Sequence, residues 1–268
     1  MTNVLDRFRL DGRVALVAGG ASDFGMPITR ALAQAGADVA IADLAPERAL
    51  HAVSAANEAG HRSFAAACDA TRRDDCDAFV ARVERELGAP SVLVNLIAAP
   101  VKKGPSESYD DEAFLRMLDV NVRGLFVFAQ AVRPAMLRAG GGSIIHFAST
   151  SGVLGMKEQA AYTASKGAVI QLTRTLAVEW APAIRVNAIG PSWFMTEGLR
   201  VAVEGDPAKG VPPSAPGYLE HAKSLVPLGR MGDVEEMAAP VLFLASAASS
   251  MVTGHLLMVD GGLTVGRT

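Results

Sequence analysis

The stretch RVALVAGGASDFGMPITRALAQAGADVAIAD (13–43) contains an apolar strand candidate, a glycine-rich turn, a helical segment and a second apolar strand candidate. The strand candidates are 13–18 and 37–43, and the helical segment covers 24–35. Strands that are apolar throughout and are joined by a helix indicate parallel neighbours buried on both faces. This βαβ unit predicts an α/β protein.

The same alternation continues along the chain. Further strand candidates are 61–68, 91–97, 143–148, 184–189 and 256–260, and further helical segments are 46–58, 71–87, 111–138, 161–180 and 233–247. The sequence therefore predicts a single domain over 1–268, built as a doubly wound, Rossmann-like parallel sheet with helices on both faces. Pro240 is expected to kink the last helix, because proline removes a backbone N–H bond.

Residues 197–225 interrupt this alternation with a stretch rich in proline and glycine, EGDPAKGVPPSAPG (204–217). Loops of this length in compact domains are usually functional lids or disordered excursions. We expect a substrate lid, because candidate site residues flank the segment, and an idle loop is the alternative.

Composition bounds the class of protein. Of 268 residues, 50% are hydrophobic and 20% charged, which is typical of a well-packed soluble protein. The net charge of −3 and the lack of a basic run argue against a nucleic-acid or anionic-membrane partner. No apolar run approaches the ~20 residues of a membrane span, and residues 1–13 lack an apolar signal core. Cys68 and Cys76 predict reduced thiols and no metal site, so the expected compartment is the cytoplasm.

The turn AGGASDFG (18–25) follows the first strand and opens the first helix. Glycines at this place let backbone N–H groups approach a pyrophosphate at the positive end of the helix. Asp43 ends the second strand, where a carboxylate accepts hydrogen bonds from the adenine ribose and repels a 2′-phosphate. Residues 18–24 contain no Arg or Lys. The pattern favours NAD over NADP, and the alternative for Asp43 is a cap for the helix that begins near Pro46.

Four polar side chains form a candidate catalytic set. Tyr162 and Lys166 are four residues apart, which places them on one face of the expected helix. A nearby ammonium lowers the pKa of a phenol and makes it a usable acid or base, whereas a solvated helix face is the alternative. Ser149 follows the strand 143–148 and would hold a substrate oxygen. Asn121 lies near the start of an apolar helix, as a satisfied core amide or as part of a polar relay.

In this order the motifs resemble the short-chain dehydrogenase/reductase family. The resemblance runs nearly end to end and includes Asp69, Asn95, Pro191 and Thr196, with the tail segments PLGRMGDVEE (227–236) and VTGHLLMVDGG (252–262). The branch that it resembles contains 3-oxoacyl-acyl carrier protein reductases and sugar or polyol dehydrogenases.

The resemblance implies roles for the site residues. Tyr162 would be the general acid/base, Lys166 would lower its pKa and bind the nicotinamide ribose, Ser149 would orient the substrate oxygen, and Asn121 would anchor a water in a proton relay. Asp69 would bind the adenine, and Thr196 the carboxamide. The implied cofactor contacts are Gly19, Ser22, Asp23, Phe24, Gly25, Asp43, Asp69, Asn95, Tyr162, Lys166, Pro191, Phe194 and Thr196.

The chain departs from the family pattern at several positions in or near the expected cofactor site. The departures are Ala18 and Asp23 in the glycine-rich turn, Leu96 to Ala98 after the fourth strand, His146 in the place of Asn, and Ser192 after Pro191. Asp23 is expected to repel the cofactor phosphates and to cap the first helix.

Two classes of function follow from these residues. The first is an NAD-dependent oxidoreductase that interconverts a secondary alcohol and a ketone, with a 3-oxoacyl-thioester reductase as an alternative enzyme. The second is a degenerate family member that binds a nucleotide or a partner protein with little turnover. The complete catalytic set favours the enzyme. The resemblance also implies a homotetramer, and the segment EEMAAPVLFLAS (235–246) is apolar over more than one face; burial within one subunit is the alternative.

Overall fold

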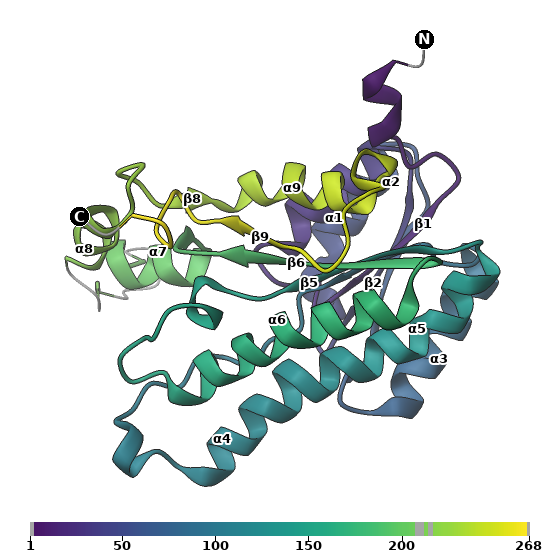
Figure 1. The fold of residues 1–268 in the computed structure, drawn as a ribbon. Coiled ribbons are helices and arrows are strands. Elements are labelled where there is room, and N and C mark those ends of the chain that lie inside the picture. The colour runs from purple at the N-terminus through teal and green to yellow at the C-terminus, as the bar shows by residue number, and fades with distance from the viewer. Residues whose placement is uncertain (1–2, 207–211, 214–216, 267–268) are drawn as a thin grey trace.

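Seven parallel strands form one sheet in the order β3–β2–β1–β4–β5–β6–β9 (Figure 1). The structure is a computed structural model, and it describes residues 3–206, 212–213 and 217–266. The strands are β1 (Val14–Ala18), β2 (Asp38–Asp43), β3 (Ser63–Ala67), β4 (Val92–Asn95), β5 (Gly142–Phe147), β6 (Ile184–Pro191) and β9 (Leu256–Val259). The predicted doubly wound parallel sheet is confirmed.

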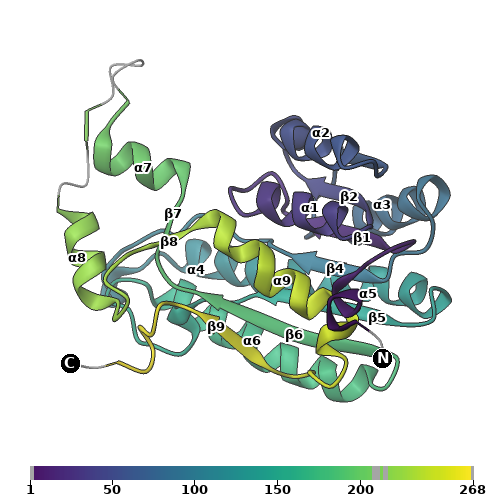
Figure 2. The same ribbon diagram turned by 90° about the horizontal axis from the view of Figure 1, so that it is seen from above.

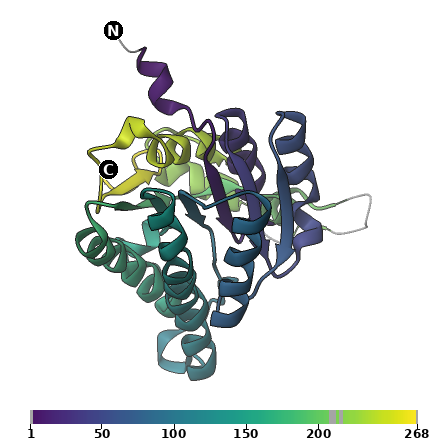
Figure 3. The same cartoon turned by 90° about the vertical axis from the view of Figure 1, so that its right-hand side faces the viewer.

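Helices cover both faces of this sheet (Figures 1 and 3). One face carries α1 (Gly25–Gln34), α2 (Leu50–Glu58) and α9 (Ala238–Ala245), and the other carries α3 (Arg73–Glu86), α4 (Asp111–Leu118), α5 (Leu125–Arg138) and α6 (Ala160–Trp180). Successive residues of a strand point to opposite faces. In β1, Leu16 packs with the α3 and α5 side chains, whereas Ala15 and Val17 pack with those of α1. Both faces of the central strands are buried, so most of the residues in these strands are apolar.

The order of the strands reverses at β1, which lies between β2 and β4. Ala18 at the end of β1 pairs with Asn95 at the end of β4. The Ala18 carbonyl accepts a hydrogen bond from Leu96 N at 2.8 Å, and Gly19 N donates to the Ala42 carbonyl at 2.7 Å. In open α/β sheets such a reversal leaves a crevice at the carboxyl ends of the strands, where ligands bind.

The expected helix 111–138 is a continuous helical run with a π-helical segment, η4 (Asp119–Gly124), between α4 and α5. Asn121 lies in this segment, just before the apolar α5 begins at Leu125, which agrees with the prediction that it lies near the start of an apolar helix. One-turn π segments are frequent at functional sites, because they change the direction of the side chains that they carry.

The expected helix 233–247 is a 3₁₀ turn, η7 (Val234–Met237), followed by the shorter α9. Pro240 therefore lies in the first turn of α9, where backbone N–H groups have no intrahelical acceptor, and the predicted interior kink is wrong. Val241 and Leu244 of α9 are fully buried in the same subunit. Their burial favours the alternative that the apolar segment 235–246 is buried within one subunit instead of in an interface between subunits.

The segment predicted as a long lid loop contains two helices, α7 (Glu197–Glu204) and α8 (Tyr218–Leu225), beyond the carboxyl ends of the strands (Figure 2). The short strand β7 (Phe194–Met195) precedes this segment and the short strand β8 (Gly232–Asp233) follows it. The two strands pair in parallel and so hold the two ends of the segment close together. Residues 207–211 and 214–216 of the predicted loop lie outside the described residues.

Short 3₁₀ turns complete the secondary structure. They are η1 (Val4–Phe8), η2 (Pro46–Ala49), η3 (Ser106–Ser108), η5 (Thr150–Gly152) and η8 (Ala247–Ser249). Within the described ranges, no helix has both the length and the apolar character needed to cross a membrane.

Candidate active site

Two cavities meet at the carboxyl ends of the strands. The larger has a volume of about 710 Å³ and the smaller about 140 Å³, and both are lined by Gly19, Asp43 and Ala98. Of the predicted site residues, the larger cavity is lined by Gly19, Ser22, Asp23, Phe24, Asp43, Tyr162, Lys166, Pro191 and Thr196. Asp69 lines the smaller cavity. The two cavities form one elongated cleft with the Tyr162–Lys166 pair in its larger part.

Two glycines of the turn are required by close backbone contacts. A Cβ atom on Gly25 would lie 1.9 Å from the Gly20 carbonyl oxygen, inside any possible contact distance. Gly19 has a φ of +75°, and its Cβ would lie 3.0 Å from the backbone of Leu96 and Ile97. The turn therefore adopts this conformation only with glycine at these positions.

Asp23 is exposed and caps no helix. The first helical residue is Gly25, the N-cap residue is Phe24 in a helical backbone conformation, and no side chain bonds to this end of α1. The predicted cap by Asp23 is wrong, because the helix begins one residue too late for Asp23 to take the cap position. Phe24 instead packs edge-on against Phe194, with 5.5 Å between ring centroids.

Asp43 connects two turns. Its Oδ2 accepts a hydrogen bond from Ala21 N at 2.9 Å, and its Oδ1 accepts one from Ala45 N at 3.0 Å. The second bond supports the alternative that Asp43 organises the turn before the next helix, and the carboxylate also lines the cleft. Arg48, five residues further on, lines the larger cavity as well. The sequence reasoning missed Arg48, because it considered basic residues only within 18–24.

Two further predicted cofactor contacts, Asp69 and Asn95, have different surroundings. Asp69 Oδ1 accepts hydrogen bonds from the hydroxyl and backbone N–H of Thr71 at 2.7 and 2.9 Å, and these bonds lower the pKa of Asp69. Asn95 is fully buried; its amide donates to the Leu125 carbonyl at 3.1 Å, and its Oδ1 accepts from Ile97 N at 3.4 Å. Asn95 lines neither cavity of the cleft, so it supports the end of β4 from below the cleft.

Lys166 is almost fully buried on α6. Its Nζ donates a hydrogen bond to the Phe147 carbonyl at 2.7 Å and lies 5.8 Å from the centre of the Tyr162 ring. Burial lowers the pKa of Lys166 to about 8, because the charged ammonium loses its hydration.

Tyr162 lines the larger cavity, and the buried Ser149 lies beside it. Burial raises the pKa of Tyr162, and a hydrogen bond with Ser149 acts in the opposite direction. The pKa of Tyr162 is therefore not lowered as expected, since the phenolate loses more by desolvation than it gains from the Ser149 hydrogen bond. Ser149 Oγ accepts a hydrogen bond from Ser151 N at 3.1 Å, which fixes the hydroxyl at the start of η5.

Asn121 connects the loop after β4 to the catalytic helix. Its Oδ1 accepts from Ala99 N at 2.7 Å, and its Nδ2 donates to Ser165 Oγ at 2.9 Å. The Ser165 hydroxyl in turn donates to the Tyr162 carbonyl at 2.8 Å. Asn121 is thus a satisfied buried amide that also positions the backbone of Tyr162. Ser165 was missed from the sequence, because its role depends on this chain of contacts.

His146 is fully buried near Lys166. Its Nδ1 is 3.1 Å from Thr173 Oγ1, and the Thr173 hydroxyl donates to the Val169 carbonyl at 2.8 Å. The ring therefore donates from Nδ1, and Nε2 has no partner among the described residues. Burial and the charge of Lys166 lower the pKa of His146 to about 3, so the ring is neutral.

Thr196 joins the cleft to the lid helices. Its Oγ1 accepts a hydrogen bond from Leu199 N at 3.3 Å, which caps α7, and the residue lines the larger cavity. Pro191 lines the same cavity from the end of β6, whereas the Phe194 ring is buried in the core.

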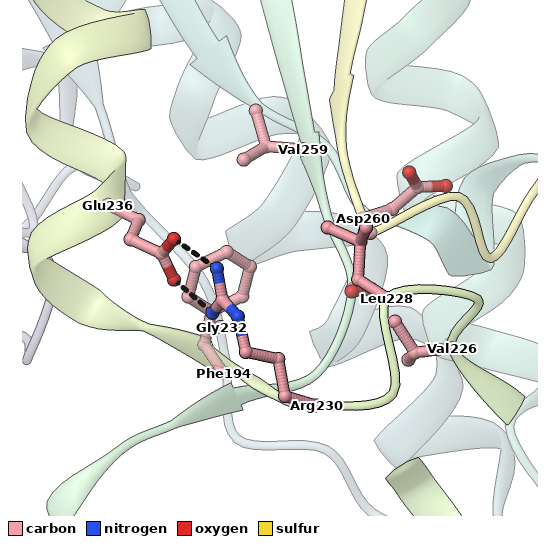
Figure 4. Close-up of a pocket in the computed structure, with 10 residues that line it drawn as sticks. Phe194, Val226, Leu228, Arg230, Gly232, Glu236, Val259 and Asp260 are labelled. Carbon is pink, nitrogen blue, oxygen red and sulfur yellow. Dashed lines mark hydrogen bonds and ion pairs between the residues drawn. The ribbon is translucent and has the colours of Figure 1, made fainter. Parts of the chain in front are cut away.

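Phe194 also lines a separate cavity of about 100 Å³ (Figure 4). Two hydrogen bonds of 2.7 Å join Arg230 and Glu236 across it, and Arg230 lowers the pKa of Glu236 to about 2. A Cβ on Gly232 would lie 2.4 Å from the Phe194 ring. None of the candidate catalytic side chains lines this cavity, and its Arg230 and Glu236 charges pair with each other, so we assign it to the joint between β7, β8 and β9.

Comparisons with known proteins cover nearly the whole chain. A family model described as "Enoyl-(Acyl carrier protein) reductase" matches residues 19–264. D-threitol dehydrogenase of Mycolicibacterium smegmatis is 37% identical over 261 residues, 96% of this chain and 95% of that protein. The structure of a gluconate 5-dehydrogenase from Burkholderia cenocepacia in complex with NADP and tartrate is 35% identical, with a TM-score of 0.87 over 99% of this chain and 100% of that one. The structure of an NAD⁺-bound xylitol dehydrogenase is 32% identical in sequence, with a TM-score of 0.84. The match covers 94% of this chain and 99% of that one.

Proposed function

Because the chain belongs to the short-chain dehydrogenase/reductase family, we propose that it is an NAD-dependent enzyme that interconverts a secondary alcohol and a ketone of a sugar or polyol. The observation that carries this proposal is the buried Lys166 beside Tyr162 and Ser149, at the end of an elongated cleft. The rival class, a nucleotide-binding protein with little turnover, has no support from the sugar and polyol dehydrogenases among the relatives.

The residues of the cleft fit a dinucleotide. The open backbone at Gly19 and Gly25 and the uncapped start of α1 suit a pyrophosphate, because no side chain competes for that helix end. Asp43 is placed to accept ribose hydroxyls, and Asp69 lines the smaller cavity for the adenine. Lys166 and Thr196 would hold the nicotinamide end. The preference for NAD over NADP rests on the Asp43 carboxylate.

When bound, the nicotinamide gives or takes the hydride. The protein transfers the proton: the Tyr162 hydroxyl protonates the oxygen of a ketone, or its phenolate takes the proton of an alcohol. The Ser149 oxygen accepts from Ser151 N and its side chain is hydrogen-bonded to Tyr162, so Ser149 is placed to orient the substrate oxygen beside Tyr162. The Lys166 ammonium stabilises negative charge on Tyr162 during the transfer. Asn121 holds α6 in register through Ser165.

A sugar or polyol substrate is preferred over a 3-oxoacyl thioester. The relatives compared above act, by their names, on threitol, xylitol and gluconate. We propose that 197–225 is the substrate lid of a single domain, because Thr196 both caps α7 and lines the cavity that holds Tyr162. A lid that begins at the reacting centre couples closure to the presence of ligand.

We also propose a homotetramer in the cytoplasm. Three helices on one face of the sheet carry exposed apolar side chains: Leu115 is 65%, Leu137 41% and Val178 81% exposed. Such side chains favour a covered face. Cys68 and Cys76 are free thiols, as suits a reducing compartment. Light scattering should give about four times the mass of one chain, and the mass of one chain would contradict the assembly.

The activity is tested by incubating the protein with NAD and a panel of polyols, sugar acids and a 3-oxoacyl thioester, and following the absorbance of the reduced nicotinamide. We expect turnover with at least one polyol or sugar acid. A matched variant, Ser149→Ala, should bind NAD with unchanged affinity and turn over ~10²-fold more slowly. Tight NAD binding with no turnover on any member of the panel would support the rival class.

A further inference from the structure

A separate cavity of about 300 Å³ lies at the amino ends of the strands, whereas the cofactor cleft lies at their carboxyl ends. Residues at or next to the starts of β1, β4, β5 and β6 line it, namely Arg13, Val92, Gly142 and Arg185. Arg9 lines it as well, and no Asp or Glu does so among the described residues. A cavity walled by one sign of charge favours a ligand of the opposite sign, in this case an anion.

Arg185 is half-buried in this cavity and forms no ion pair with any acid that the structure describes. Its Nη1 donates to Ser249 Oγ at 2.8 Å and to the Val252 carbonyl at 3.2 Å. Its Nη2 donates to the Leu244 and Ser246 carbonyls, at 3.0 and 3.1 Å, where α9 ends. A helix C-terminus carries only about half a negative charge, so the guanidinium charge is not neutralised. The Nε of Arg185 has no hydrogen bond within the described ranges and is not fully buried, so one N–H remains for a ligand.

Arg13 supplies a second positive charge without a partner. It is exposed, and its side chain forms no hydrogen bond or ion pair with any described residue. Its backbone is fixed just before β1, because its N–H donates to the Leu10 carbonyl at 2.9 Å. Arg9 differs, since both oxygens of Asp11 accept hydrogen bonds from its guanidinium. Two guanidinium groups of this cavity, those of Arg13 and Arg185, are therefore available to an anion.

The walls of the cavity suit a compact, polar ligand. Three successive glycines, 140–142, form part of the lining, and the described lining residues include no aromatic side chain. A Cβ on Gly141 would lie 2.2 Å from the Ala183 carbonyl oxygen, and one on Gly142 would lie 2.4 Å from that of Ser91. Side chains are thus excluded from this wall by close backbone contacts. A nucleotide base or an aromatic acid would find no ring on which to stack.

We propose that this cavity binds a phosphate group through Arg13 and Arg185, either as inorganic phosphate or as a small phosphate monoester. A planar guanidinium forms paired, charge-assisted hydrogen bonds with phosphate oxygens. Two of them match the charge of about −1.5 to −2 that a phosphate monoester carries at pH 7. The site lies at the opposite ends of the strands from Tyr162, so the phosphate is an additional ligand and not a substrate or a cofactor. This inference does not depend on the proposed function.

The first test is calorimetric titration of inorganic phosphate and of glycerol 3-phosphate, with and without NAD, into the parent protein, Arg13→Ala and Arg13→Lys. The parent should bind phosphate equally well with and without NAD. In Arg13→Ala we expect the Kd of phosphate to rise about tenfold, and Arg13→Lys should recover part of the affinity. Arg174→Ala is the matched control, because Arg174 is an exposed arginine of α6 that does not line this cavity.

A second pair of variants tests the cavity without touching an arginine. Gly140 has a φ of +85°, and a Cβ there would meet nothing within 4 Å. Asp and Asn both tolerate this backbone conformation and have nearly the same size. Gly140→Asp places a negative charge beside the bound phosphate, so its Kd for phosphate should be about tenfold higher than that of Gly140→Asn. High salt should reduce this difference.

The two probes separate the two sources of the phosphate group. Tighter binding of glycerol 3-phosphate supports a phosphate monoester as the ligand, and tighter binding of inorganic phosphate supports the free ion. A parent protein that binds neither probe up to about 10 mM overturns the proposal. A Kd that is the same in the parent, Arg13→Ala and Gly140→Asp overturns it as well. Displacement of the phosphate by NAD would assign it to the cofactor cleft, and would also overturn the proposal.

Discussion

Replacing Asp23 by Asn removes one negative charge from the cofactor cleft while it keeps the size of the side chain. Asp23 is exposed, so its repulsion of a cofactor phosphate acts through a largely aqueous medium and amounts to about 1 kcal/mol near 4 Å. Loss of this repulsion should tighten NAD binding about fivefold. Because Asp23 caps no helix, the free energy of unfolding of the free protein should change by less than about 0.5 kcal/mol.

Calorimetric titration with NAD at low and at high salt measures this effect. Screening should reduce the difference between parent and variant as salt rises, since the charges face solvent. Glu58→Gln, at the end of α2, is the control for the change in net charge, because it lies outside both cavities. Weaker NAD binding by Asp23→Asn would refute the reasoning, and it would identify the carboxylate as an acceptor for a ribose hydroxyl.

Three further predictions follow from the site. Tyr162→Phe should lower kcat/KM by ~10²–10⁴ with little change in the Kd of NAD, and a variant that keeps a tenth of the activity would exclude Tyr162 as the proton donor. His146 stays neutral in the folded protein with a pKa of about 3, whereas the unfolded chain binds a proton below about pH 6.5. The parent should therefore lose stability as pH falls through this window, by up to about 1.4 kcal/mol per pH unit, and urea unfolding of His146→Asn should lack this component. Gly25→Ala should lower the Tm and weaken NAD binding, because its Cβ meets the Gly20 carbonyl, whereas Gly155→Ala has open space and should not.

The strands and their order along the chain were predictable from the sequence, because strands buried on both faces are apolar throughout. The lid helices were not, since the proline- and glycine-rich stretch between them dominates the composition. A signal for α7 was nevertheless present in Thr196, a preferred N-cap residue that is followed directly by Glu197.

The candidate site divides in the same way. The spacing of Tyr162 and Lys166 was enough to select them as a candidate pair on one helix face. The raised pKa of Tyr162 depends on its burial, which cannot be derived from the spacing. Ser165 acts through its contact with Asn121, which lies far away in the sequence, and no local pattern marks it. The π-helical turn around Asn121 was hidden for a similar reason, because its apolar neighbours fit an ordinary helix as well.

The double attachment of Asp43 bears on how cofactor use can evolve in this protein. A mutation that removes the carboxylate loses the hydrogen bonds to Ala21 N and Ala45 N together, so it disturbs the glycine-rich turn and the turn before η2 at once. Substitution of Asp43 is therefore expected to change cofactor binding and the stability of both turns together, so this position cannot be altered for one property alone.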